Sequence, residues 1–186
     1  MKSFAANMQE KRLADQSLGE FIFLNQTRYD LNDNVTILGC TLWSNVPSSA
    51  SHEVSLRLND FRKIKSWTTE THNAAHIADA EWLDRECAKL RNEQPERRII
   101  ILTHHAPAIQ GTSAPQYQGG SVNTAFATDM SLRSCWGNPL SVWAFGHTHF
   151  NCDFVKDNVR IVSNQRGYEG IEASQSRFSD DFVLNL

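Results

Sequence analysis

The chain has 186 residues, and 40% of them are hydrophobic, which is enough for one domain over residues 1–186 with its own core. The net charge is -3 without any block of like charges, so bulk electrostatics indicates no nucleic-acid or membrane partner. No apolar run approaches the roughly 20 residues that span a bilayer, and the first residues lack the apolar core of a signal peptide. We therefore expect a cytoplasmic protein. The cysteines are widely spaced and are expected to be free thiols in or near the core: Cys40, Cys87, Cys135 and Cys152.

The first half of the chain predicts one terminal helix, two strands and one long helix. Residues 1–18 have helical spacing, 21–26 and 35–43 are β-type runs, and a loop follows at 46–52. Residues 69–91 give the clearest helix, because apolar residues recur there every three or four positions. This apolar stripe consists of Ile77, Ala80, Leu83, Cys87 and Leu90.

The second half predicts further strands around a long loop. Residues 99–102 are too apolar for a strand with a wet face, which is typical of a strand inside a parallel sheet. The polar segment 106–124 predicts a long loop. The remaining expected elements are a short helix at 125–135, a strand at 141–145, a hairpin formed by 152–155 and 159–164, and a last strand at 181–186. This mixture predicts an α/β fold with a mixed sheet, with α+β as the alternative.

Histidines follow both apolar strands of the second half. His104 and His105 come after the first strand, and His147 and His149 come after the second. If these strands are parallel neighbours, their carboxyl ends meet at one edge of the sheet, where ligand sites form in open α/β sheets. Imidazole is a ligand for Zn, Fe and Mn ions. The spacing alone leaves two readings open, a metal site and a set of structural histidines with hydrogen-bond partners.

The segments that hold these histidines resemble a known family. ILTHHAP and the later WAFGHTH are similar to the last two motifs of the calcineurin-like metallophosphoesterases. Four further segments resemble a fungal and bacterial branch of that superfamily: ILGCTLWS, LNDFRKIKSW, HNAAHIADAEWL and SNQRGY. The resemblance implies the C-terminal half of a β-sandwich flanked by helices. It also implies a hydrolase that cleaves a phosphate-ester small molecule or a nucleotide.

The resemblance assigns roles to the histidines. His104 and His147 would bind one divalent ion of the Mn, Fe or Zn type, and His149 would bind a second ion beside it. A hydroxide held between the two ions would attack phosphorus in line with the leaving group. His105 would contact the phosphate or orient a neighbouring ligand.

The sequence also departs from the family pattern. The motifs D-x-H, G-D and G-N-H-[DE], which supply the remaining ligands including a bridging aspartate, do not occur in the 186 residues. The resemblance therefore implies an N-terminally truncated domain that holds at most one weakly bound ion and is inactive or severely impaired alone. Two alternatives remain open. One is a non-catalytic scaffold or binding remnant of the fold, and the other is a hydrolase with a single zinc ion on three histidines.

Further polar residues are weaker candidates for a substrate pocket. Asn59 and Asp60 either contact substrate or cap a helix, and His72 either lines the pocket or lies on the surface. His72 also lies on one helix face with His76 and Asp79, a spacing that zinc accepts and that an exposed helix face shows equally well. Arg166 either binds phosphate or is an exposed residue of a turn.

A final expectation concerns the sheet. If one of its faces lacks a covering layer, apolar side chains on it would favour self-association. Strand alternation makes four residues the candidates for that face: Ile99, Ile101, Val142 and Ala144.

Overall fold

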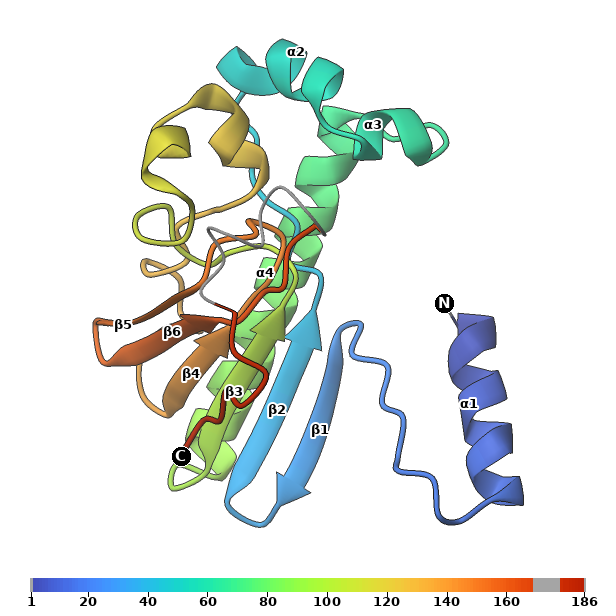
Figure 1. Cartoon of the computed structure of the whole chain (residues 1–186). Helices are drawn as coiled ribbons and strands as arrows, with labels where there is room; N and C mark the ends of the chain where they lie inside the picture. The colour runs from blue at the N-terminus through green and yellow to red at the C-terminus, as the bar shows by residue number, and fades with distance from the viewer. Residues whose placement is uncertain (1, 169–177, 186) are drawn as a thin grey trace.

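The computed structural model describes residues 2–168 and 178–185, and its centre is one six-stranded sheet (Figure 1). The strands lie in the order β1-β2-β3-β4-β6-β5. Their bounds are Thr27–Asn32 for β1, Val35–Cys40 for β2, Arg98–Thr103 for β3, Leu140–Ala144 for β4, Cys152–Lys156 for β5 and Val159–Ser163 for β6. The helices are α1 (Lys2–Ala14), α2 (Ser48–Arg57), α3 (Asp60–Lys63) and α4 (Thr69–Glu93), with 3-10 segments η1 (Pro115–Tyr117) and η2 (Ser121–Ala125). Among the described residues, no helix combines the length and the apolar character needed to cross a membrane.

The sheet is mixed, as the sequence predicted. β2, β3, β4 and β6 run parallel to one another, and β1 and β5 pair antiparallel at the two edges. The predicted hairpin is β5 with β6, and the apolar run 99–102 lies inside the parallel sheet as β3. The α/β class with a mixed sheet is therefore confirmed. The four parallel strands end at one edge, and in Figure 1 α2 and η2 lie above that edge.

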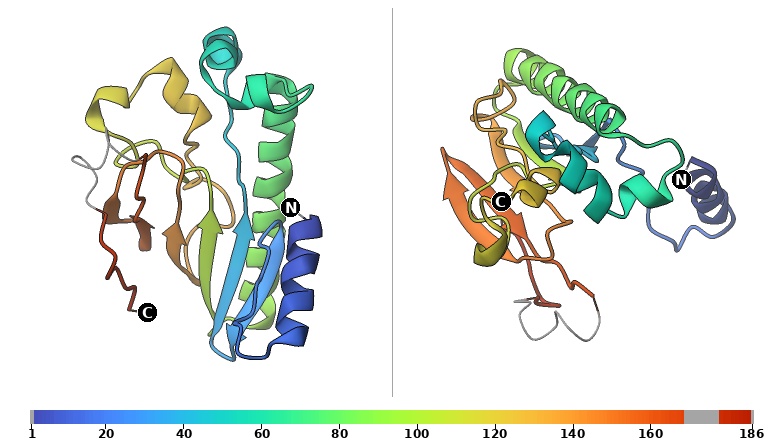
Figure 2. Two further views of the ribbon diagram at one scale, coloured as in Figure 1. Left: turned by 45° about the vertical axis from the view of Figure 1, so that its right-hand side comes forward. Right: turned by 90° about the horizontal axis from the view of Figure 1, so that it is seen from above.

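The main core lies between the sheet and α4, which covers one face (Figure 2). Ile99, Ile101 and Trp143 point from the sheet into this core, where they meet Leu83 and Cys87 of α4. All five side chains are fully buried. Burial of apolar surface contributes about 25 cal/mol per Å², so this interface is the main source of stability. All four cysteines are free and three are buried, as expected.

The opposite face of the sheet corrects the prediction of an uncovered apolar face. Val142 lies on this face and Ala144 packs against the same cluster, but Ile99 and Ile101 lie under α4 instead, because the alternation in β3 is shifted by one residue. The buried members of the face are Val35, Ile100, Val142 and Val162, each 8% exposed or less. The segment that carries Leu184 packs against them and crosses β3 in Figure 1. Self-association through this face stays a prediction.

Several predicted elements differ from the structure. Residues 21–26 are irregular, and β1 begins only at Thr27. The reason is visible at Gly39 of β2, where a Cβ atom would lie 2.5 Å from the Cβ of Leu24, so the irregular segment packs directly onto the strand. The expected strand at 181–186 is irregular over 181–185, and the expected helix at 125–135 consists of turns. The expected loop at 46–52 includes the start of α2, which packs on η2 through Val54 and Ala125.

The N-terminus of α4 is closed by a capping box. The Thr68 hydroxyl accepts from the Thr71 backbone, and the Thr71 hydroxyl accepts from the Thr68 backbone. Thr68→Ala leaves helix N–H groups without this partner and is expected to lower the free energy of unfolding by about 1 kcal/mol. Urea unfolding of the variant measures the loss, and Thr68→Ser, which keeps the hydroxyl, is the matched control. An equal loss in both variants would show that the hydroxyl is not the cause.

Candidate metal centre

The histidines that the sequence placed at strand ends lie together at the carboxyl edge of the sheet. β3 and β4 are adjacent and parallel, so the residues after them enter the same region. The backbone fixes this arrangement, because the Gly146 N–H donates to the His104 carbonyl at 3.0 Å. The N–H groups of His104 and His105 both donate to the carbonyl of Thr41, which follows β2. Three strand ends are thereby tied to one another.

Three imidazoles form the centre of this region. Ligand nitrogens of His104, His105 and His147 all lie within 4.8 Å of one another. The ring centroid of His147 is 4.6 Å from that of His104 and 4.2 Å from that of His105. His104 is exposed, His105 is buried and His147 is half-buried, so the cluster opens to solvent on one side. Three imidazoles with one open side match the ligand set of catalytic zinc sites.

His147 has the strongest mark of a ligand. Its Nε2 is buried without a hydrogen-bond partner among the described residues. Burial lowers the pKa of its ring to about 3, and the neighbouring His104 adds to the shift, so the ring is neutral at pH 7. Its ring stacks on Phe126 with centroids 4.4 Å apart. A buried nitrogen without a partner costs about 1–3 kcal/mol. The lone pair of a neutral ring nitrogen can coordinate a cation, which would remove this cost. The residues present therefore fit an ion of the Zn, Fe or Mn type.

His105 is held by a serine behind the cluster. The Ser44 Oγ lies 2.8 Å from His105 Nδ1, and both residues are buried. Burial holds the pKa of His105 well below its ordinary value, so this ring is neutral as well. When Nδ1 donates to the serine oxygen, Nε2 keeps its lone pair for a cation. Sequence reasoning missed Ser44, because a serine after a strand gives no signal of its contact across the sheet.

His149 lies beside the cluster and is not one of its three members. It is close enough that its positive charge would lower the pKa of His104 and of His147. The backbone N–H of His149 donates to Gln165 Oε1 at 2.9 Å, and the His149 ring lies edge-on to the Tyr168 ring with centroids 4.5 Å apart. The structure thus brings together two of the three predicted ligands and adds His105. The assignment of His149 to a second ion stays a prediction.

The predicted substrate residues occupy different positions around the cluster. Partial burial of the ring lowers the pKa of His104, and the negative charge of the half-buried Asp60, which begins α3, offsets part of that shift. Asn59 is exposed, accepts from Arg62 at 3.1 Å and makes no side-chain cap. Arg166 is exposed. His72 is fully buried behind His105, with ring centroids 5.8 Å apart, and so has no open face for substrate.

Backbone strain is concentrated at this edge of the sheet. Among the non-glycine residues with positive φ are His147 at 69°, His149 at 52°, Leu42 at 69° and Trp43 at 41°. A non-glycine residue in this region costs about 1–3 kcal/mol and persists where the surroundings enforce it, commonly at functional sites. Strain on both sides of the histidine cluster supports the assignment of this edge as the site.

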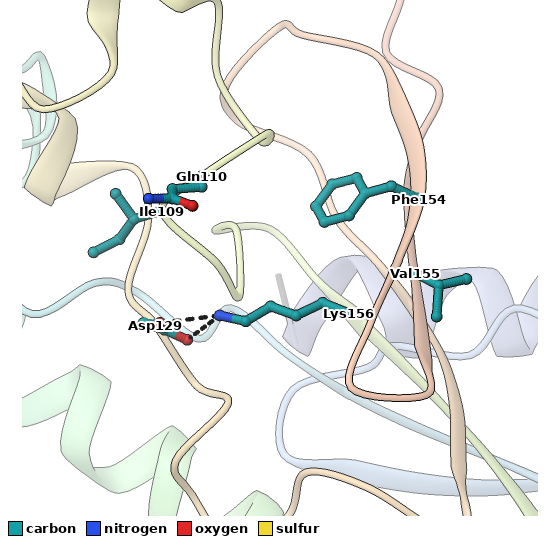
Figure 3. Close-up of a pocket in the computed structure, with 6 residues that line it drawn as sticks. All are labelled: Ile109, Gln110, Asp129, Phe154, Val155 and Lys156. Carbon is teal, nitrogen blue, oxygen red and sulfur yellow. Dashed lines mark hydrogen bonds and ion pairs between the residues drawn. The ribbon is translucent and has the colours of Figure 1, made fainter.

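A separate cavity of about 470 Å³ lies near β5 (Figure 3). It is lined by Ile109, Gln110, Asp129, Phe154, Val155 and Lys156. The Lys156 ammonium donates to both carboxylate oxygens of Asp129 at 3.0 Å, so its only charges already form a pair. None of the histidines lines this cavity, and its residues offer no comparable chemistry.

The comparisons with known proteins give one named relative. The chain is 32% identical over 173 residues to a protein of Acanthamoeba polyphaga mimivirus described as "Uncharacterized protein L509". The match covers 87% of this chain and 60% of the viral protein, so the chain spans about three fifths of the length of that relative. No protein-family model matches the chain, and no solved structure matches it.

Proposed function

We propose that the chain carries part of the active site of a metal-dependent phosphoric ester hydrolase of the calcineurin-like metallophosphoesterase type. The observation that carries the proposal is the convergence of His104, His105 and His147 from the ends of two parallel strands. The order of the motifs around these histidines supports it as well. Under this proposal the sheet is one half of the sandwich to which the resemblance points. The substrate is a phosphate-ester small molecule or a nucleotide.

Each residue has a defined task in the proposed reaction. His104 and His147 would hold one divalent ion through neutral imidazoles, and His149 would hold its neighbour. Ions bound there would supply a hydroxide nucleophile and neutralise charge on the phosphoryl oxygens. Asp60 would act on His104 through its charge, and Arg166 would contact the phosphate.

The proposal includes a limit on this chain. Two divalent ions at close distance repel each other, and the bridging carboxylate that offsets the repulsion belongs to motifs absent from the 186 residues. Among the described residues, the metal cluster contains only imidazoles. We therefore expect at most one weakly bound ion and no turnover of an aryl phosphate with added Mn²⁺. Turnover that disappears in His147→Ala would contradict this limit and would show that the ligands present suffice.

A second candidate function is favoured by the composition of the cluster. His104, His105 and His147 form a three-imidazole set with an open side, which suits a hydrolase with one zinc ion. The two candidates give different roles to His105 and His149. In the single-ion site His105 is a ligand and His149 is dispensable, whereas the family pattern makes His149 a ligand and His105 a neighbour.

Zinc titration of two single variants separates these candidates. If the family pattern holds, His149→Ala lowers the amount of bound metal, and His105→Ala changes affinity by about 10–100-fold at most, as loss of an orienting residue does. If the single-ion site holds, His105→Ala removes zinc binding and His149→Ala leaves the wild-type affinity. Calorimetric titration gives affinity and stoichiometry for both. A wild-type chain that binds no zinc, manganese or iron would contradict both candidates.

A further inference from the structure

The first half of α4 buries polar side chains where the second half buries apolar ones. His72, His76 and Asp79 are exposed by 5% or less, and Ile77, which the sequence placed on the buried stripe, is 50% exposed. None of the three buried polar residues belongs to the metal cluster. Burial raises the pKa of the Asp79 carboxyl and lowers the pKa of His76, so both groups are held at a cost that some function of the site offsets.

His76 and Asp79 both contact the backbone of Leu42. The His76 Nδ1–H donates to the Leu42 carbonyl at 2.9 Å. The Asp79 carboxylate accepts from Gln26 Nε2 at 2.9 Å, and it lies close enough to the Leu42 backbone for that backbone to counteract part of the rise in its pKa caused by burial. The two side chains, one turn apart on α4, thus face the backbone of a single residue. We call this arrangement the Leu42 clamp.

The clamped residue begins a strained turn that leads to the metal cluster. Leu42 and Trp43 both have positive φ, which is costly for large side chains. The next residue, Ser44, places its Oγ 2.8 Å from His105 Nδ1, and its N–H donates to His72 Nε2 at 3.4 Å. Only Trp43 therefore separates Leu42 from the serine that holds His105. Without the clamp, the turn is free to leave the left-handed region and carry Ser44 away.

We propose that His76 and Asp79 are positioning residues that hold the Leu42–Trp43 turn so that Ser44 keeps the His105 ring in one tautomer and one orientation. Their action on the metal centre is indirect, because neither touches a reacting atom. The inference rests on the proposed function only where it concerns catalysis. The geometry of His105 is a property of the metal-free chain and is tested without turnover.

The ring nitrogens of His105 report the tautomer directly in ¹⁵N NMR spectra of the full chain without metal at pH 7. The wild type is expected to show one protonated and one bare nitrogen. In Asp79→Ala and His76→Ala, the two nitrogen signals are expected to move toward the averaged values of exchanging tautomers. Asp79→Asn keeps an oxygen acceptor for Leu42 and Gln26 and is expected to retain the wild-type spectrum.

Asp84→Ala is the matched control on the same helix. Asp84 accepts from the Cys135 backbone at 2.8 Å and pairs with Arg133, so its loss destabilises α4 packing through contacts that do not include Leu42. This variant is expected to melt at a lower temperature and to keep the His105 spectrum. Zinc affinity is expected to fall about 10–100-fold in Asp79→Ala and less than two-fold in Asp84→Ala.

Three results would overturn the inference. They are exchanging tautomers of His105 in the wild type, an unchanged His105 spectrum in folded Asp79→Ala or His76→Ala, and an equal change in Asp84→Ala. The failure of the proposed function has a different signature, because a chain that hydrolyses no phosphate ester can still show a fixed His105 that depends on Asp79.

Discussion

His147→Ala is expected to weaken binding of Zn²⁺ or Mn²⁺ to the chain by at least about 100-fold, because removal of a ligand costs more than the 10–100-fold loss of a residue that orients one. His147 lies between the other two imidazoles, with centroids 4.6 Å and 4.2 Å away. Its Nε2 is also the buried nitrogen without a partner among the described residues. Loss of this ring therefore leaves only two imidazoles in the cluster.

Calorimetric titration of the metal-free protein measures this effect. His52→Ala is the control, because His52 lies exposed on α2 and tests whether any histidine contributes to metal uptake. The control is expected to keep the wild-type affinity. If both variants bind with wild-type affinity, the metal centre lies elsewhere or does not exist. If both lose affinity to the same degree, the binding is nonspecific.

The metal-free chain is expected to lose at least about 4 kcal/mol of unfolding free energy between pH 7.5 and pH 5.5. Burial lowers the pKa of His72 to about 4 and that of His147 to about 3, and it lowers the pKa of His105 in the same direction. The unfolded chain binds protons at these histidines below about pH 6.5, whereas the folded chain does not. Each histidine therefore destabilises the fold by roughly 1.4 kcal/mol at pH 5.5, one unit below the unfolded pKa.

Urea unfolding at the two pH values tests this expectation. The loss begins as the pH falls through about 6.5, the unfolded pKa of histidine, and for His72 it continues toward pH 4. Exposed carboxylates titrate mostly below the interval from pH 7.5 to pH 5.5. His72→Gln should reduce the loss by about 1 kcal/mol, and the exposed His52→Gln should leave it unchanged. A free energy that stays constant between the two pH values would mean that these rings are protonated or solvated in the folded state. Saturating zinc should raise the free energy of unfolding at both pH values and leave the pH dependence from these rings unchanged, because they are already neutral in the folded chain.

The sheet was predictable from the sequence wherever strands are apolar on both sides. β2, β3, β4 and the β5–β6 hairpin lie where runs of β-branched residues were found. The failures occur where burial depends on distant partners. Residues 21–26 have strand composition but pack as an irregular segment onto Gly39, and Ile99 faces α4 because the register of β3 is set by its neighbours. Neither fact is encoded in local spacing.

The part of the site that is placed by the ends of the strands was predictable from the sequence. His104 and His147 were placed together because two parallel strands end there, and the structure confirms that neighbourhood. The inclusion of His105 was not predictable, because a strand end fixes where two adjacent residues lie but not which ring turns inward. The burial of His76 and Asp79 was also missed, because the periodicity placed Ile77 on the buried face of the helix. In a sequence, polar residues on a buried helix face cannot be distinguished from those on an exposed face.

The spacing of His72, His76 and Asp79 on α4 restricts which changes of chain length the protein tolerates. An α-helix turns by about 100° per residue, so one inserted residue before Asp79 would rotate His72 and His76 away from the loop after β2 while the rest of α4 stayed packed. The exposed segment from Pro115 to Gly120 bears no such requirement and can change length at little cost. In an alignment of natural relatives, insertions and deletions should therefore collect in this segment and be absent from Thr69 to Leu83.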